Sequence, residues 1–298
     1  MPLRIVFFGL PLAALLLARD GHQIELCAVC RKDALGLRRA TRTFGKERMW
    51  VRPRANDAAL LKRVRTIAPD LVVSWFWTTR LPMNIVETAR LGAIGVHPSL
   101  LPRHRGPDPT TWAILSGDDV TGVTVHRIAA EYDTGAMLEH ETLRIDPAWN
   151  AWNLARALDR PSLRALRRTV ARFARGEPVP EKPQDEHLAT EAPFLDEEAC
   201  AIRWSWPNER ILRLIRALAP APGAWTEING SLVHVHAAEP VMRFPAALEP
   251  GEGYIDAERA VVRTGDGAIA LLRGEIEGQE AKAKDLCRLF FSDAPLLG

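Results

Sequence analysis

The chain has 298 residues, which is long enough for two domains that each bury a core. Hydrophobic residues make up 47% and charged residues 26%, as in ordinary soluble globular proteins, and four cysteines are too few for a disulfide-stapled scaffold. The net charge is only +2, but residues 1–175 hold 27 basic against 16 acidic residues, whereas residues 176–298 hold 12 against 21. The N-terminal half therefore either faces an anionic partner or presents a solvated basic surface.

The chain opens with a predicted strand over residues 3–9 and a predicted helix over residues 11–19. This opening resembles a secretory signal peptide in that Arg4 precedes an apolar stretch. The break at Gly9-Leu10-Pro11, however, divides the stretch into a strand-length and a helix-length piece. The stretch is also shorter than the roughly 20 apolar residues that span a bilayer. We therefore expect a cytoplasmic protein with no membrane partner.

Apolar runs and helical patterns alternate through the first 175 residues. Further strand-like runs cover residues 23–29, 71–75, 93–97 and 122–128, and helical spacing covers residues 57–68 and 150–175. Strands that alternate with helices predict right-handed βαβ units in a Rossmann-like, doubly wound parallel sheet. Cys27 and Cys30 form a CxxC without a second ligand pair nearby, so core packing is favoured over a metal or redox role.

The composition changes after residue 176. The polar, proline-bearing segment from Gly176 to about Ala199 is typical of a linker. A helical pattern over residues 207–219 then precedes short β-like runs separated by glycines, namely AWTEI, LVHVHA, AVVRT and AIALL. These runs predict a small β-barrel of the OB-like kind. The expected organisation is an α/β domain over residues 1–180, a linker over 181–203 and a β-barrel domain over 204–298.

A histidine and an aspartate each follow an expected strand. His97 ends the run 93–97, and Asp133 stands in an Asp-Thr-Gly just past the run 122–128. Ligands of open α/β sheets bind beyond the carboxyl ends of the strands, so the two side chains could meet there if their strands are neighbours. A carboxylate beside an imidazole favours its charged form and fixes its orientation. Alone, the pattern is modest, since a histidine at a strand end is more often structural and Asp-Thr-Gly is also a turn signal.

The order of these motifs resembles that of the folate-dependent formyltransferase family. The matching segments are Arg4–Gly9, His97–Pro102, Arg105-Gly106, Thr121–Thr124 and Asp133–Gly135. The resemblance continues through residues 183–193, 202–204 and 215–226, where it is similar to methionyl-tRNA formyltransferases in particular. It thus extends over nearly the whole chain.

The resemblance implies that 10-formyltetrahydrofolate donates a formyl group to a primary amine, with no metal and no covalent enzyme intermediate. In the family an Asn, a His and an Asp carry this reaction, which passes through a tetrahedral carbon with an oxyanion. His97 and Asp133 match the last two. Asp133 would hold His97 in its charged form, and His97 would steady the oxyanion.

The third position departs from the family pattern. The Asn is expected two residues before the histidine, where this chain has Gly95. Loss of one oxyanion donor costs about 2.7–4 kcal/mol in another enzyme class. Three explanations stay open. Another group, such as His126 or a backbone N–H, replaces the Asn; or the acceptor chemistry differs; or the protein is a folate-binding or RNA-binding homologue without catalysis.

The resemblance also implies ligand contacts. The residues expected at the folate donor are Trp75, Trp77, Leu81, Ser99, Thr134 and Gly135, and those expected at the acceptor are Arg105, Asp108 and Trp112. For the tryptophans, stacking on a planar ring and packing in the core are both consistent with the sequence.

The acceptor stays open between initiator methionyl-tRNA and a small amine. The two-domain organisation favours tRNA, and the basic stretch Arg31–Arg54 could cradle RNA. Residues Pro107–Trp112, however, look more like the formyltransferases of amino sugars and other small metabolites. The basic loop also lacks the glycine-rich insertion that grips the acceptor arm in tRNA-directed members, and an acidic C-terminal half is a poor surface for a phosphate backbone.

Overall fold

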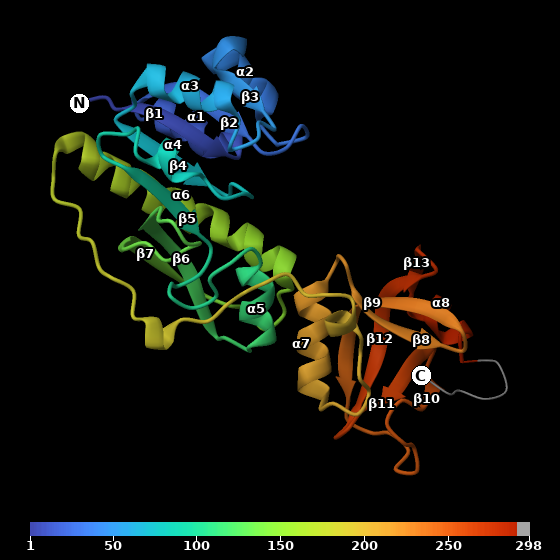
Figure 1. Ribbon diagram of the computed structural model, residues 1–298. Coiled ribbons are helices and arrows are strands. Elements are labelled where there is room, and N and C mark those ends of the chain that lie inside the picture. The colour runs from blue at the N-terminus through green and yellow to red at the C-terminus, as the bar shows by residue number, and fades with distance from the viewer. Residues whose placement is uncertain (291–298) are drawn as a thin grey trace. The chain divides into compact units, whose positions relative to one another are not determined.

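The computed structural model describes residues 1–290, and the chain forms two compact units (Figure 1). The first unit comprises Met1–Pro109, Val120–Arg144 and Ala157–Ala192. The second comprises Thr110–Asp119, Ile145–Arg156 and Pro193–Gly298, and residues 291–298 of it, which belong to the expected C-terminal domain, lie outside the described residues. The two units interleave along the chain, because two short internal segments pack with the second unit. The expected division at residues 180 and 204 stays a prediction.

The first unit is built on a seven-stranded sheet in the order β3-β2-β1-β4-β5-β6-β7. The strands are β1 (Arg4–Gly9), β2 (Gln23–Val29), β3 (Met49–Val51), β4 (Leu71–Trp75), β5 (Ala93–His97), β6 (Val120–Arg127) and β7 (Met137–Arg144). Neighbours from β3 through β5 pair in parallel, as expected of a doubly wound fold. The sequence-based expectation of a parallel sheet is therefore confirmed for this part of the unit.

The last two strands differ from the expectation. The strand expected over residues 122–128 is β6, and it runs antiparallel to β5, while β7 runs antiparallel to β6. A parallel connection needs a crossover whose helix packs back on the same sheet. Between β5 and β6 the chain instead forms a loop and the short helix α5 (Pro109–Leu115), most of which belongs to the second unit. The chain therefore returns along β5 in the opposite direction.

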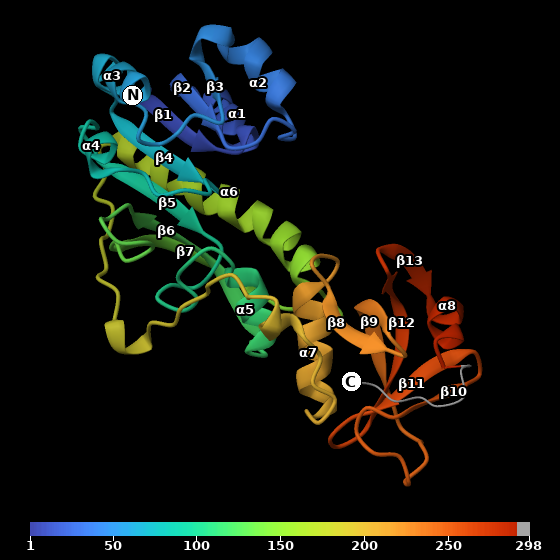
Figure 2. The same ribbon diagram turned by 45° about the vertical axis from the view of Figure 1, so that its right-hand side comes forward.

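Helices cover both faces of this sheet. They are α1 (Pro11–Arg19), α2 (Leu37–Phe44), α3 (Ala58–Ile67), α4 (Met83–Val86) and the long α6 (Ala151–Arg175), with a 3-10 turn η1 at Lys46–Arg48. On one face, α3 and α4 pack against Val6 and Phe8 of β1. On the other face α6 runs along the sheet (Figure 2). Its Ser162 accepts a hydrogen bond from the buried Trp75 Nε1 of β4 at 3.0 Å. Local signals fix the helix starts, since Pro11 begins α1 and the Asp57 side chain caps α3.

The expected linker is attached to the first unit over much of its length. Lys182 pairs with Met137 of β7 through two backbone hydrogen bonds of 2.8 and 2.9 Å. Further along, the Arg105 carbonyl accepts the Ala192 N–H, and the Arg105 N–H donates to the Thr190 carbonyl. The 3-10 turns η2 (Glu186–Leu188) and η3 (Glu198–Cys200) interrupt this segment. Residues 182–192 thus lie beside the carboxyl-terminal loops of the first sheet.

The second unit holds an antiparallel sheet in the order β10-β11-β12-β9-β8, with β13 added on β12. Its elements are α7 (Asn208–Leu218), β8 (Ala224–Ile228), β9 (Ser231–Val241), β10 (Gly253–Asp256), β11 (Arg259–Arg263), β12 (Ala268–Ile276), β13 (Gln279–Lys282) and α8 (Ala283–Arg288). Apolar residues of α7, including Ile211 and Ile215, join Val235 and Leu271 of the sheet in one core. This helix-on-sheet packing stabilises the unit by removing the apolar face of α7 from water.

The closed, OB-like barrel expected here is not found. Within residues 1–290 no hydrogen-bonded pairing joins β8 to β10, so the sheet stays open. Alternating apolar residues predict strands, but closure depends on hydrogen bonds between the first and last strands, which local patterning does not encode. The structural finding is an open antiparallel sheet covered by α7 and α8.

The long helix α6 is amphipathic and arginine-rich. Neither α6 nor any other helix within residues 1–290 is both long enough and apolar enough to cross a membrane.

Candidate active site

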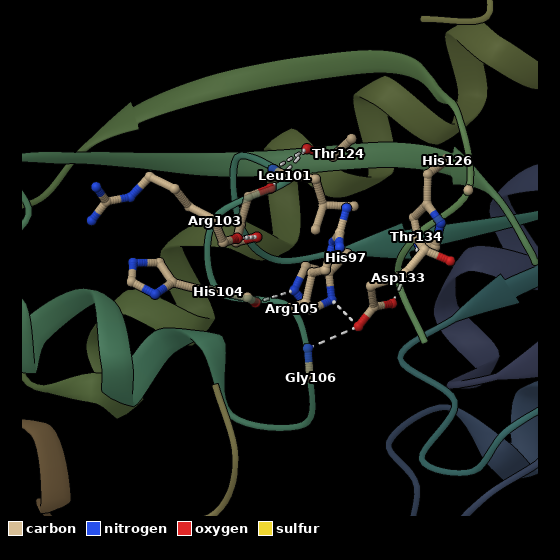
Figure 3. A network of polar contacts seen from close by, with 12 residues as sticks. His97, Leu101, Arg103, His104, Arg105, Gly106, Thr124, His126, Asp133 and Thr134 are labelled. Atoms are coloured by element: carbon tan, nitrogen blue, oxygen red, sulfur yellow. Dashed lines mark hydrogen bonds and ion pairs between the residues drawn. The ribbon is translucent and has the colours of Figure 1, made fainter. Parts of the chain in front are cut away.

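His97 is buried at the end of β5, with 6% of its surface exposed. Its Nε2 lies 2.7 Å from the carbonyl oxygen of His104. Because a carbonyl oxygen only accepts, this nitrogen carries a proton and donates it. Its other nitrogen, Nδ1, lies 3.4 Å from Oδ2 of Asp133 (Figure 3). Both nitrogens of His97 thus have partners within the first unit.

The loop after β5 folds back so that the His104 carbonyl reaches His97. The Ser99 hydroxyl donates to the Arg103 carbonyl at 2.6 Å, and the Thr124 hydroxyl of β6 donates to the Ser99 carbonyl at 2.8 Å. The same Thr124 oxygen accepts the Leu101 N–H at 3.1 Å. These bonds attach the Pro-Ser-Leu-Leu-Pro loop to the neighbouring strand. They thereby hold the His104 carbonyl, which accepts the hydrogen bond of His97, in place.

Asp133 lies between two imidazoles. Its Oδ2 accepts the backbone N–H of Gly106 at 3.0 Å and faces His97. Its Oδ1 lies 3.6 Å from Nε2 of His126 on β6 (Figure 3). The loop that carries Asp133 is anchored by Gln184, whose Nε2 donates to the carbonyls of Asp133 at 2.6 Å and Gly135 at 2.8 Å. A side chain of the expected linker therefore sets the position of the carboxylate.

His97 and Asp133 lie together as expected, but the strands that precede them are not the parallel neighbours that the sequence predicted. Parallel neighbours would have put both residues at the same sheet edge by strand direction alone. Because β6 is antiparallel, it ends beside the start of β5, with Arg127 opposite Ile94. The β6–β7 loop, residues 128–136, must fold back toward the end of β5, and Asp133 adopts a left-handed φ of 55° within it.

Gly95 lies in the middle of β5, paired with Ser74 of β4 and His126 of β6. A Cβ at this position would meet the His126 imidazole, with Nε2 at 3.0 Å and Cε1 at 3.3 Å. His126 is itself buried, with 5% exposed, and its Nδ1 lies 2.8 Å from the carbonyl oxygen of Arg127. Burial lowers the pKa of His126, Asp133 opposes this shift and His97 adds to it.

Most of the residues expected at the folate donor are buried or in contact with other parts of the first unit. Trp75 is only 2% exposed, bound to Ser162 within the core, and Leu81 is packed among the apolar residues of α3 and α4. Ser99 is fully buried and holds its own loop. Thr134 donates to the Glu131 carbonyl at 3.2 Å, and a Cβ on Gly135 would come within 1.9 Å of the Arg127 carbonyl. At Gly135 only glycine fits.

Trp77 is half-buried and its Nε1 has no hydrogen-bond partner among the described residues. It lines a cavity of about 740 Å³ beyond the carboxyl ends of β2, β3 and β4. Three arginines share this cavity, namely Arg52, Arg54 and Arg80, and the lining also includes Cys30. The combination of an aromatic ring and cationic groups is suited to a planar or anionic ligand.

The residues expected at the acceptor are engaged within the protein. The Arg105 guanidinium is 5% exposed and binds Glu186 and Gln184 through bonds of 2.8–3.0 Å. The Glu186 carboxylate raises the pKa of Arg105. Asp108 donates its N–H to the Ala192 carbonyl at 3.0 Å. Trp112 belongs to the second unit, where its Nε1 donates to the Pro193 carbonyl at 2.7 Å.

Neither a metal centre nor a reactive thiol emerges from the described residues. No group of His, Cys, Asp or Glu in residues 1–290 has the arrangement of a metal site. All four cysteines are free thiols, and burial raises the pKa of Cys27 to about 12 and that of Cys30 above its usual value. The chemistry that the site offers is proton transfer and hydrogen bonding, through two imidazoles that share one carboxylate.

Both halves of the chain match known families. Residues 22–170 match the family model described as "Formyl transferase", and residues 195–290 match "Formyl transferase, C-terminal domain". The methionyl-tRNA formyltransferase of Chlorobium limicola is 33% identical over 97% of this chain and 96% of the relative. That of Solibacter usitatus is 40% identical over 67% of this chain and 63% of the relative.

Two solved structures have a similar fold. HypX from Aquifex aeolicus in complex with tetrahydrofolic acid has a TM-score of 0.70 at 18% identity, over 99% of this chain and 48% of that one. The chain therefore spans about half the length of HypX. WlaRD, a sugar 3N-formyl transferase in the presence of dTDP and 5-N-formyl-THF, has a TM-score of 0.66 at 13% identity, over 94% of this chain and 99% of that one.

Proposed function

The chain belongs to the folate-dependent formyltransferase family, and from this premise we propose that it transfers a formyl group from 10-formyltetrahydrofolate to a primary amine. The observation that carries the proposal is the buried pair of His97 and Asp133, whose nitrogen and oxygen lie 3.4 Å apart at the end of β5. The family resemblance predicted these two residues as the reacting pair. Their meeting through a folded-back loop supports a built site rather than a chance arrangement.

Transfer needs three events at one carbon. The amine nitrogen attacks the formyl carbon, the carbonyl oxygen becomes an oxyanion, and the bond from the carbon to N10 of the folate breaks. His97 would steady the oxyanion by donating its Nε2 proton, for which the formyl oxygen would compete with the His104 carbonyl. Asp133 would hold the imidazole in the required orientation from the Nδ1 side. The amine proton must end on N10.

The folate would bind beyond the carboxyl ends of β4 and β5. Thr134 and Gly135 would line its pocket through their backbone, which Gln184 holds in place. Trp77, whose Nε1 is buried, would offer its half-buried ring to the pterin. Trp75, Leu81 and Ser99 would act indirectly, as buried supports of these loops. No described residue group suggests a metal in this mechanism.

The first acceptor that we propose is initiator methionyl-tRNA. The support is the similarity to methionyl-tRNA formyltransferases, which in the Chlorobium limicola relative extends over 96% of that protein's length. The match of residues 195–290 to the C-terminal family domain adds to it. The basic residues of the first half would meet the phosphate backbone.

A small anionic amine, such as a sugar nucleotide, is the second candidate. The three arginines of the cavity that Trp77 lines would bind the phosphates of a small acceptor beside the pterin. The acidic balance of residues 176–298 points in the same direction. A formylation assay with initiator methionyl-tRNA and a dTDP-linked amino sugar as parallel acceptors decides between them.

A further inference from the structure

His126 occupies the space that a side chain at position 95 would fill. The two residues pair directly across β5 and β6. A Cβ at Gly95 would be 3.0 Å from Nε2 of His126, closer than ordinary van der Waals contact. The imidazole therefore lies over the glycine and puts a polar ring where the family pattern has the side chain of an Asn.

The hydrogen bonds of His126 leave one nitrogen for chemistry. Nδ1 lies 2.8 Å from the Arg127 carbonyl oxygen, which only accepts, so Nδ1 carries a proton. Nε2 points the other way, toward Oδ1 of Asp133 at 3.6 Å, which is too far for a direct hydrogen bond. By contrast, Nε2 of His97 carries the proton that it donates to the His104 carbonyl at 2.7 Å, so it cannot accept one.

The surroundings of His126 favour its neutral form. Burial is the largest effect and lowers its pKa, and the nearby His97 lowers it further, while Asp133 raises it. These are the two titratable side chains that face the ring, His97 from β5 and Asp133 from the β6–β7 loop, and Ser74 on β4 is uncharged. A neutral ring with a proton on Nδ1 has its lone pair on Nε2.

We propose that His126 is a catalytic residue that carries the proton of the acceptor amine to N10 of the folate. This rests on the proposed function. As the amine nitrogen bonds to the formyl carbon, Nε2 of His126 takes one proton from that nitrogen. As the carbon–N10 bond breaks, the imidazolium returns the proton to N10, so the products are the N-formyl amine and tetrahydrofolate. The ring thereby occupies the space of the missing Asn, carries a proton instead of donating to the oxyanion, and needs no further co-reactant.

The test is the pH dependence of transfer in wild type, His126→Gln and His126→Ala, with His140→Gln as control. His140 is an exposed histidine on the neighbouring strand β7. Wild type and the control should lose kcat/KM as pH falls and His126 becomes protonated. In His126→Gln the part of this acid limb that comes from His126 should vanish, leaving only the limb set by protonation of the acceptor amine itself. The rate above it should drop about 100-fold or more, the usual range for general acid–base catalysis. Added imidazole should restore part of the activity of His126→Ala.

Calorimetry with 5-formyltetrahydrofolate separates this role from misfolding, since each variant should bind folate as wild type does. A His126→Gln variant that binds folate, keeps the acid limb of wild type and transfers within threefold of wild type would overturn this inference but leave the proposed function standing. A wild type that binds folate but formylates neither methionyl-tRNA nor an amino sugar would overturn the proposed function, and this inference with it. A variant that loses folate binding assigns His126 a structural role and also overturns the inference.

Discussion

Asp133 Oδ2 lies 3.4 Å from Nδ1 of His97, although the strands that precede the two residues run in opposite directions. The contact exists because the β6–β7 loop folds back and is anchored by Gln184. The same carboxylate accepts the Gly106 N–H and faces His126. One aspartate thus holds the loop after β5 and faces both imidazoles.

We expect Asp133→Asn to reduce formyl transfer by about 100-fold or more, because the orienting negative charge beside His97 is lost. The amide oxygen can still accept the Gly106 N–H, so the loop should keep its place. Steady-state transfer and folate calorimetry on the same preparation check this. A loss of folate binding equal to the loss of transfer would contradict an orienting role.

We expect Gly95→Asn alone to slow transfer, although it restores the family residue. The new Cβ would lie 3.0 Å from His126 Nε2 and would displace the ring. The double variant Gly95→Asn with His126→Ala removes this conflict and should be faster than either single variant, as the Asn then supplies an oxyanion donor. Equal rates for all three, or acceleration by Gly95→Asn alone, would show that His126 does not take the place of the Asn.

Gln184→Ala should impair transfer without touching the imidazoles. Its amide donates to the Asp133 and Gly135 carbonyls, and its oxygen accepts from Arg105, so its removal frees the Asp-Thr-Gly loop. We expect kcat to fall about tenfold, on the order of 1.4 kcal/mol in barrier. Lys182→Ala is the matched control, since Lys182 is exposed and binds β7 only through its backbone. Equal effects of the two variants would refute the anchoring role.

The buried His126 should also make stability depend on pH. Its pKa in the folded chain is lowered below the ordinary 6.5. As pH falls below 6.5, the unfolded chain therefore binds a proton at His126 before the folded chain does. The free energy of unfolding declines as pH falls from 6.5 toward the pKa of His126 in the folded chain. His22 and His236 have lowered pKa values as well, so the relevant quantity is the difference between wild type and His126→Gln. The urea midpoint should change more between pH 7.5 and pH 5.5 in wild type than in His126→Gln. Equal changes in the two proteins would contradict the lowered pKa of His126.

The sequence predicted much of the first unit, for identifiable physical reasons. Uninterrupted apolar runs such as residues 3–9 and 71–75 mark strands buried on both faces, and these became β1 and β4. The direction of β6 was wrong, because burial gives a strand the same pattern whichever way it runs. Strand β7 was missed, since Glu139 and Glu141 stand on its less exposed face, where they pair with arginines of α6, and so the strand lacks an apolar run.

The site was predicted in part. His97 and Asp133 came from a motif resemblance, and the structure puts them in contact. Trp75 was expected beside the folate, but only the tertiary structure reveals that its ring is buried against α6. The alignment of His126 with Gly95 depends on strand register, which a single sequence leaves open. A histidine within a strand that is buried over most of its length was the available signal.

The most direct test of the account follows a radiolabelled formyl group from 10-formyltetrahydrofolate in single-turnover reactions. Wild type and His97→Ala are each mixed with initiator methionyl-tRNA or with a dTDP-linked amino sugar, and the product is separated from the donor. We predict that wild type labels at least one acceptor, while His97→Ala binds the folate yet transfers at least about 100-fold more slowly. If His97→Ala labels the same acceptor as fast as wild type, or if wild type binds the folate and labels neither acceptor, the central claim is wrong.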